Sequence, residues 1–200
     1  MSEGGRDGVN PKMESRATTL PGVQLLKPRY FHDTRGYFVE TYNSRLADTL
    51  GLPARFVQDN QSLSVVRGTV RALHFQVPPQ AQAKLVRVLH GSVYDVAVDL
   101  RVGSPHYGRW TAERLTAAGG EQLFVPRGFA HGFCTLEANT EVAYKVDDYY
   151  APELEQGIAW DDPTLAIDWP VAAADAVLSG KDRKLGRFGD FVSPFRYDGV

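Results

Sequence analysis

The 200-residue sequence contains a single cysteine, Cys134, so it can form no internal disulfide and no Cys-x-x-Cys metal site. It also has no excess of positive charge, because 22 basic and 24 acidic side chains give a formal net charge of −2. Nucleic-acid-binding domains normally carry a basic excess, so binding to nucleic acid is not expected. No apolar run approaches the roughly 18 residues of a membrane helix, so no association with a membrane is expected. The reducing cytoplasm is the expected compartment.

The usual nucleotide-binding loops are missing as well. No Gly-x-Gly-x-x-Gly follows a predicted strand, and no Gly-x-x-x-x-Gly-Lys-Ser/Thr occurs anywhere in the chain. Strands do not alternate with helices, which argues against a doubly wound α/β fold.

Short β-branched and aromatic segments dominate the chain instead. These predicted strands cover residues 37–42, 69–75, 84–90, 92–100 and 141–150. Glycine and proline turns separate them, a pattern typical of a sandwich or barrel. In the segment 92–100, alternation places Val93, Asp95, Ala97 and Asp99 on one face. Helices are expected only near 44–50 and 152–156, so the fold class is predicted to be all-β.

The chain is predicted to form one domain with a tail. Residues 1–17 are rich in glycine, serine, asparagine and charge, which predicts a flexible N-terminal tail. Residues 18–200 show no break in composition and predict a single domain. A domain of this size can bury roughly 70% of its unfolded surface.

Two histidines occur in related settings. Gly68 precedes His74 by six residues, and Gly120 opens a segment that ends in Pro126-Arg127-Gly128-Phe129-Ala130-His131. These two segments resemble the two motifs of the cupins, in which a glycine turn is followed by a strand that aims a histidine into a barrel. The resemblance implies a double-stranded β-helix, or jelly-roll barrel, with few short helices.

A metal site is not expected in this barrel. Metal-dependent cupins have a second histidine two residues after the first, and here that position is Gln76. The position of the family's glutamate falls near Gln80 or Ala81, neither of which is acidic. A tight metal site usually needs three or four protein ligands, and only two imidazoles remain.

Other residues near these motifs could serve acid–base chemistry. An aspartate beside a histidine would orient it as a general base, and Asp182 lies in a Gly-Lys-Asp loop. Lys84 and Tyr144 are candidates too. Taken alone, Lys84 is more simply a solvated residue at a strand end, whereas a packed aromatic and a functional residue are equally good interpretations of Tyr144. Arg71 stands three residues before His74, so a regular strand would point the two to opposite faces. Both can reach one pocket only if the strand is irregular.

A longer series of ordered segments carries a more specific resemblance. The matching segments are 33–40, 56–60, 71–76, 81–87, 96–101, 103–105, 126–133, 144–145, 160–163, 167–170 and 179–182. They resemble the dTDP-4-dehydrorhamnose 3,5-epimerase family, metal-free cupins of deoxysugar-nucleotide biosynthesis, over roughly residues 22–185. One departure is Arg71-Ala72-Leu73-His74, where the family usually has Arg-Gly-Leu-His.

The resemblance implies a role for each matching residue. His74 would be the general base paired with Asp182, Tyr144 the acid, and Lys84 the stabiliser of the enolate oxygen. The implied substrate-binding residues are Arg35, Tyr37, Phe38, Glu40, Gln58, Asn60, Arg71, His131, Glu155 and Lys181. The family works without a cofactor, and a homodimer is expected, with residues 33–42 crossing over to the partner.

The implied reaction converts dTDP-4-dehydro-6-deoxy-D-glucose to dTDP-4-dehydro-L-rhamnose. C3 and C5 both flank the 4-keto group, so removal of a proton from either carbon gives an enolate that a fixed cation stabilises. The alternatives are a C3-only epimerase and a 3,4-ketoisomerase acting on a related dTDP-4-keto-6-deoxyhexose. A metal-dependent cupin enzyme and a non-catalytic sugar-binding cupin are alternatives of other classes.

Overall fold

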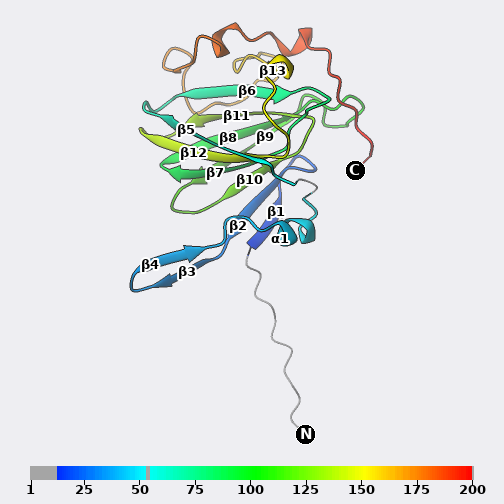
Figure 1. Cartoon of the computed structure of the whole chain (residues 1–200). Coiled ribbons are helices and arrows are strands. Elements are labelled where there is room, and N and C mark those ends of the chain that lie inside the picture. Colours follow the sequence, from blue (N-terminus) through cyan, green and yellow to red (C-terminus); the bar gives the residue numbers. More distant parts are fainter. Residues whose placement is uncertain (1–12, 53–54, 200) are drawn as a thin grey trace.

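Two antiparallel β-sheets face each other in the computed structural model, which describes residues 13–52 and 55–199 (Figure 1). The six-stranded sheet has the order β1 (Met13–Ala17), β2 (Gln24–Pro28), β10 (Gln122–Val125), β7 (Lys84–His90), β12 (Thr140–Val146) and β5 (Gln58–Ser64). The five-stranded sheet has the order β13 (Glu155–Gly157), β6 (Val70–Gln76), β11 (Phe129–Thr135), β8 (Ser92–Asp99) and β9 (Trp110–Thr116). The predicted all-β jelly-roll class is confirmed.

In the residues that the structure describes, helical structure is confined to short segments, as expected. Helix α1 (Ser44–Thr49) is capped by the Asn43 side chain, whose oxygen accepts a hydrogen bond from the Arg45 amide at 3.1 Å. The 3₁₀ turn η1 (Pro152–Leu154) falls within the second predicted helical segment, and η2 (Asp182–Lys184) and η3 (Phe188–Asp190) follow. Within the described residues, no helix has the length and apolar character needed to cross a bilayer.

The predicted boundaries of three segments need correction. Residues 13–17 were expected to belong to the tail but form β1, which pairs along its whole length with β2. Backbone pairing explains this, since polar side chains on a sheet edge do not prevent a strand from completing its hydrogen bonds. The remainder of the predicted tail, residues 1–12, lies outside the described residues. The strand expected over 37–42 is β4 (Gly36–Val39), and the one over 141–150 ends at Val146.

Strand alternation separates the interior between the sheets from the outer face. On β8, Val93 and Ala97 pack between the two sheets. Val96 and Val98 point to the opposite, outer face of the five-stranded sheet, where they pack with residues of the C-terminal segment. The predicted alternation is therefore confirmed, the face with Asp95 and Asp99 is the one between the sheets, and both aspartates have no exposed surface.

The C-terminal segment covers the outer face of the five-stranded sheet, as the orange and red trace above β6 shows (Figure 1). Ile158, Trp160 and Phe195 pack there in one cluster with residues of β6 and β8. The backbone continues this attachment, because Val102 donates to the Phe195 carbonyl and Tyr197 donates to the Val102 carbonyl, both at 3.0 Å.

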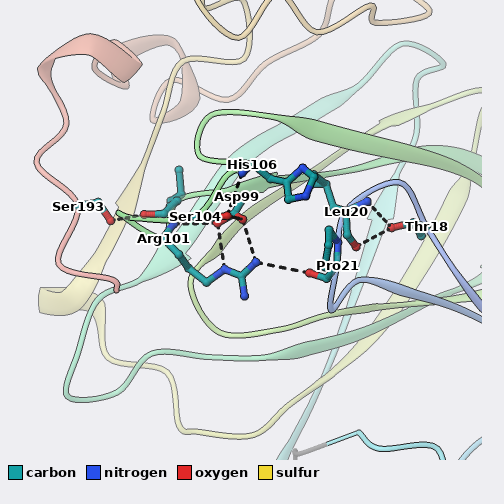
Figure 2. Close-up of polar contacts among 9 residues, drawn as sticks. Thr18, Leu20, Pro21, Asp99, Arg101, Ser104, His106 and Ser193 are labelled. Atoms are coloured by element: carbon teal, nitrogen blue, oxygen red, sulfur yellow. Dashed lines mark hydrogen bonds and ion pairs between the residues drawn. The ribbon is translucent and has the colours of Figure 1, made fainter. Parts of the chain in front are cut away.

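A polar network at the end of β8 includes Pro21 from the N-terminal part of the chain and Ser193 from the C-terminal part (Figure 2). Arg101 donates to both oxygens of Asp99 and to the Pro21 carbonyl, and Ser104 donates to Asp99 Oδ2 at 2.7 Å. The Ser193 hydroxyl donates to the Leu100 carbonyl. Burial alone would raise the pKa of Asp99, but the hydrogen bonds from Arg101 and Ser104 outweigh it and hold that pKa below its ordinary value. Asp99 is therefore an ionised structural residue of this network.

A two-stranded hairpin stands away from the barrel. It is formed by β3 (Tyr30–Asp33) and β4 and projects beyond the sheets in Figure 1. Its large side chains Phe31, Tyr37 and Phe38 are 43%, 62% and 70% exposed. Apolar surface gathered in this way commonly marks an interaction site.

Candidate active site

An irregularity in β6 brings Arg71 and His74 to the same side of the sheet. Ala72 and Leu73, although adjacent, both pack into the apolar cluster on the outer face. The pairing of β6 with β11 shifts register between the His131–His74 pair and the Phe133–Arg71 pair. This β-bulge turns two residues that are three apart toward one cavity, which both of them line. The irregularity expected from the sequence is therefore present.

His74 pairs with Asp182. Its Nε2 lies 2.6 Å from Asp182 Oδ1, and the Asp182 side chain is 5% exposed. The Asp182 amide donates to the Ser179 hydroxyl oxygen at 3.0 Å, which holds the loop that carries the carboxylate. Because Nε2 faces Asp182, Nδ1 is the ring nitrogen left to face a substrate. A neutral imidazole in this state is a competent general base.

His131 has a carboxylate partner as well, which the sequence did not single out for this role. Its Nε2 lies 2.8 Å from Oδ1 of Asp95, and both side chains are buried. Asp95 could have been suspected only from its place on the inward face of β8. The second oxygen, Oδ2, has no hydrogen-bond partner among the described residues.

Lys84 enters the interior from the opposite sheet. Its Nζ donates to the His74 carbonyl oxygen at 3.3 Å, so the ammonium lies beside the strand that carries the base. Burial lowers the pKa of Lys84 to about 8, although the charges of Asp95 and Glu155 act to raise it. A lysine of this kind is still largely charged at neutral pH and is only weakly solvated, which suits it to stabilise a negative charge.

Tyr144 lies on β12, with Val86 of β7 and Asn60 of β5 as its neighbours across the sheet. Burial, and next the charge of Glu155, raise the pKa of Tyr144, while the charge of Arg71 acts to lower it. The phenol therefore keeps its proton throughout the neutral range and can act as an acid. Nearby, Gln58 Nε2 donates to Asn60 Oδ1 at 2.9 Å.

Two adjoining cavities meet at these residues. One, of about 300 Å³, is lined by Gln58, Asn60, Tyr150 and Glu155 among others, and the second, of about 460 Å³, by Arg71, His131, Lys181 and Asp182 among others. Both cavities are lined by the same three side chains, His74, Lys84 and Tyr144. The base, the cation and the acid proposed from the sequence thus lie at one junction between the two sheets.

Glu155 joins two segments at the mouth of the site. Its Oε2 accepts hydrogen bonds from Tyr150 at 2.6 Å and from Lys181 at 2.5 Å. Burial would raise the pKa of Glu155, but these two hydrogen bonds and the Lys181 charge lower it, so the carboxylate stays ionised. Tyr150 was not predicted, since nothing in the local sequence distinguishes it from Tyr149.

The hairpin residues lie apart from these cavities within the single chain. Arg35, Tyr37 and Phe38 are exposed and line neither cavity. Arg35 forms a salt bridge with Asp33 beside it, at 2.5 Å. Glu40 accepts a hydrogen bond from Asn43 at 3.2 Å, near the start of α1. In a single protomer, therefore, these four residues do not line the cavities that hold the other predicted site residues.

Gln76 occupies the position of the second histidine of metal-dependent cupins. Its amide donates to the carbonyls of Gln80 and Tyr149 and accepts from the Ala151 amide, so all its hydrogen bonds serve the surrounding loops. In the described part of the chain, no cluster of three or more His, Cys, Asp or Glu side chains could hold a metal ion. The absence of metal stays a prediction.

Two facing antiparallel sheets with polar side chains converging between them form the jelly-roll architecture of the cupins. The model of the family described as dTDP-4-dehydrorhamnose 3,5-epimerase matches residues 17–190. The chain therefore belongs to the dTDP-4-dehydrorhamnose 3,5-epimerase family, as the sequence resemblance implied.

Individual relatives agree with this assignment. The chain is 50% identical over 179 residues to the dTDP-4-dehydrorhamnose 3,5-epimerase of Pseudomonas aeruginosa, covering 89% of this chain and 97% of that protein. The Legionella pneumophila epimerase, in complex with dTDP-4-keto-L-rhamnose, has a TM-score of 0.87 at 42% identity, covering 92% and 98% of the two chains. The Bacillus anthracis epimerase, with TDP and PPi bound, has a TM-score of 0.85 at 49% identity, covering 88% and 99%.

Proposed function

We propose that this chain inverts C3 and C5 of dTDP-4-dehydro-6-deoxy-D-glucose and yields dTDP-4-dehydro-L-rhamnose. The observation that carries this proposal is the junction of two cavities at His74, Lys84 and Tyr144, because it combines a base, a cation and an acid. Binding a sugar without reaction would require no such combination. Keto-sugar epimerisation requires all three.

The proposed reaction proceeds through an enolate. His74 Nδ1 takes the proton from C3 or C5, the C–H electron pair forms the C=C bond, and the carbonyl electron pair moves to O4. Lys84 stabilises the charge on O4, and Asp182 stabilises the imidazolium formed at His74. Tyr144 then donates its phenolic proton to the other face of the carbon as the carbonyl re-forms. Proton exchange with water returns His74 to its neutral form and Tyr144 to its phenol, and the same groups then serve the second carbon, because both carbons flank the 4-keto group.

The remaining predicted residues are proposed to bind the substrate. Gln58, Asn60, Arg71, His131, Glu155 and Lys181 line the two cavities and offer charged and amide groups for the sugar and the phosphates. Arg35, Tyr37, Phe38 and Glu40 are proposed to reach the nucleotide from the partner of a homodimer. The proposed enzyme acts in the cytoplasm, with no nucleic-acid or membrane partner.

Incubation of the protein with dTDP-4-dehydro-6-deoxy-D-glucose in D₂O tests the function. We expect deuterium at both C3 and C5, with NMR coupling constants that report inversion at each carbon. Deuterium at C3 alone would identify a C3-only epimerase, and a moved carbonyl would identify a 3,4-ketoisomerase. Either result, or loss of the exchange on treatment with a chelator, would overturn the proposal.

The free hairpin predicts a homodimer. We expect light scattering at micromolar concentration to give twice the chain mass of 22.1 kDa. Replacing Tyr37 and Phe38 together by serine should shift the protein toward the monomer, because it removes the large exposed apolar side chains of β4. Val192→Ser is the matched control, since this side chain is 91% exposed but lies in the C-terminal segment. A monomeric wild type would contradict this prediction.

The ionisation of Lys84 predicts an alkaline limit to activity. Only the charged ammonium stabilises the enolate, and its fraction falls as the pH rises through about 8. We therefore expect kcat to fall to about half at that pH and about tenfold by one pH unit above it. The Tyr144 phenol does not set this limit, because its pKa is raised above the ordinary value. In Lys84→Arg, whose guanidinium stays charged, the same decline should be absent, and a wild-type profile that stays flat would refute the assignment.

A further inference from the structure

Asp95 is a buried charge that the proposed reaction does not use. Its side chain has no exposed surface and points between the two sheets, on the face of β8 that also carries Val93 and Ala97. One oxygen accepts a hydrogen bond from His131, and the other has no hydrogen-bond partner among the described residues. A carboxylate enclosed among apolar side chains is costly unless nearby cations compensate it. The residues around Asp95 therefore have to include groups that compensate its charge.

The compensating groups are two residues of the cavity. His131 contacts Asp95 directly, and Lys84 of the opposite sheet is the cation whose pKa the charge of Asp95 raises, against the effect of burial. Both line the larger cavity, whereas Asp95 lines neither of the two. Asp95 therefore reaches the substrate only through His131 and Lys84.

The other charged and titratable groups near Lys84 come from several elements of both sheets and from the loop that carries Asp182. Glu155 of β13 also acts to raise the pKa of Lys84. The other titratable or charged side chains that line the two cavities with Lys84 are His74 and Arg71 of β6, His131 of β11, Tyr144 of β12, Tyr150, Lys181 and Asp182. Glu155 already accepts from Tyr150 and Lys181, and Asp182 already pairs with His74. Among these carboxylates, Asp95 is thus the one with a fully buried oxygen to which no described residue donates.

We propose that Asp95 is a positioning residue of the epimerisation, whose carboxylate orients His131 and keeps the Lys84 ammonium charged while the enolate forms. This inference rests on the proposed function. An indirect role for Asp95 follows from the geometry, because a carboxylate that faced O4 directly would repel the negative charge developing there. Asp95 avoids this by lying behind two cationic or hydrogen-bonding side chains.

The test compares two isosteric variants on one strand. Asp95→Asn removes the interior charge, and we expect the alkaline limb of kcat to move to lower pH by about one unit or more. Turnover at pH 8.5 should then fall about tenfold relative to wild type, with a smaller loss near pH 7 and little change in dTDP affinity. Asp99→Asn is the matched control, since Asp99 is equally buried on β8 but pairs with Arg101 and Ser104. It should lower the melting temperature without moving the pH profile.

A readout independent of activity separates this inference from the proposed function. The chain has six lysines, so selective ¹³C labelling gives few Cε resonances, and Lys84→Arg identifies the one of interest. In Asp95→Asn the Lys84 resonance should titrate at lower pH than in wild type, whether or not the substrate turns over. In a Lys84→Arg background, Asp95→Asn should no longer shift the pH profile.

An unchanged Lys84 titration in folded Asp95→Asn would overturn the inference and leave the epimerase proposal intact. Absence of epimerisation by the wild type, with the titration shifted as expected, would instead overturn the proposed function alone. If Asp95→Asn does not fold, Asp95→Ser gives a second test of the Lys84 titration, because it also removes the buried charge.

Discussion

His74→Asn is expected to lower the turnover number about 10²–10⁴-fold, the usual contribution of a positioned general base. Asparagine keeps a polar side chain of similar size beside Asp182 but cannot take a proton from carbon. Deuterium exchange at C3 and C5 should fall together with product formation, because both begin with the same proton removal. The measurement is single-turnover NMR in D₂O at saturating substrate.

The fold and the nucleotide affinity serve as controls for this variant. The melting temperature of His74→Asn and its stabilisation by dTDP should stay close to wild type, since His74 is a partly exposed cavity residue and not part of the core. Asp182→Asn should also lose rate, because the imidazolium loses its stabilising charge. Near wild-type exchange by His74→Asn would overturn the entire assignment of roles.

Tyr144→Phe is expected to separate the two halves of the reaction. His74 can still remove the proton and return it, or a deuteron, to the same face, so exchange into unreacted substrate should continue. Inverted product should accumulate about 10²–10⁴-fold more slowly, because the other face has lost its acid. Time-resolved NMR in D₂O follows the two rates in a single sample.

A matched control for Tyr144→Phe is Tyr150→Phe, which removes a hydroxyl from the mouth of the same cavity. That hydroxyl donates to Glu155, so its loss should raise KM while exchange and inversion stay coupled. Equal losses of exchange and inversion in Tyr144→Phe would contradict its role as the acid. They would indicate instead that Tyr144 holds the substrate in place.

The fold could be predicted because its main signals are local. Alternation on the segment 92–100 placed Asp95 and Asp99 on one face, and the helix expected near 44–50 is α1. Strand β1 was missed because its partner, β2, supplies the stabilisation, and Glu14, Ser15 and Arg16 give no apolar pattern. Pairing between strands depends on the whole sheet, so single-segment patterns do not report it.

The site could be predicted only in part from residue patterns. His74 and Asp182 are 108 residues apart, and no local rule brings them together, so their pairing came from the family resemblance. The β6 bulge was anticipated because Arg71 and His74 cannot share a face of a regular strand. Asp95 and Tyr150 were missed because their roles depend on contacts with His131 and Glu155 across the fold.

The C-terminal cover has a consequence for how the enzyme is made. The strands up to β12 leave the ribosome before the segment that supplies Asp182 and the side chains of Ile158, Trp160 and Phe195. A nascent or prematurely terminated chain therefore presents the bare outer face of β6, β11 and β8 to chaperones and proteases. The same chain also lacks Asp182, the partner of His74. The cover of the apolar outer face and the carboxylate that pairs with His74 are therefore both completed at the same late stage of synthesis.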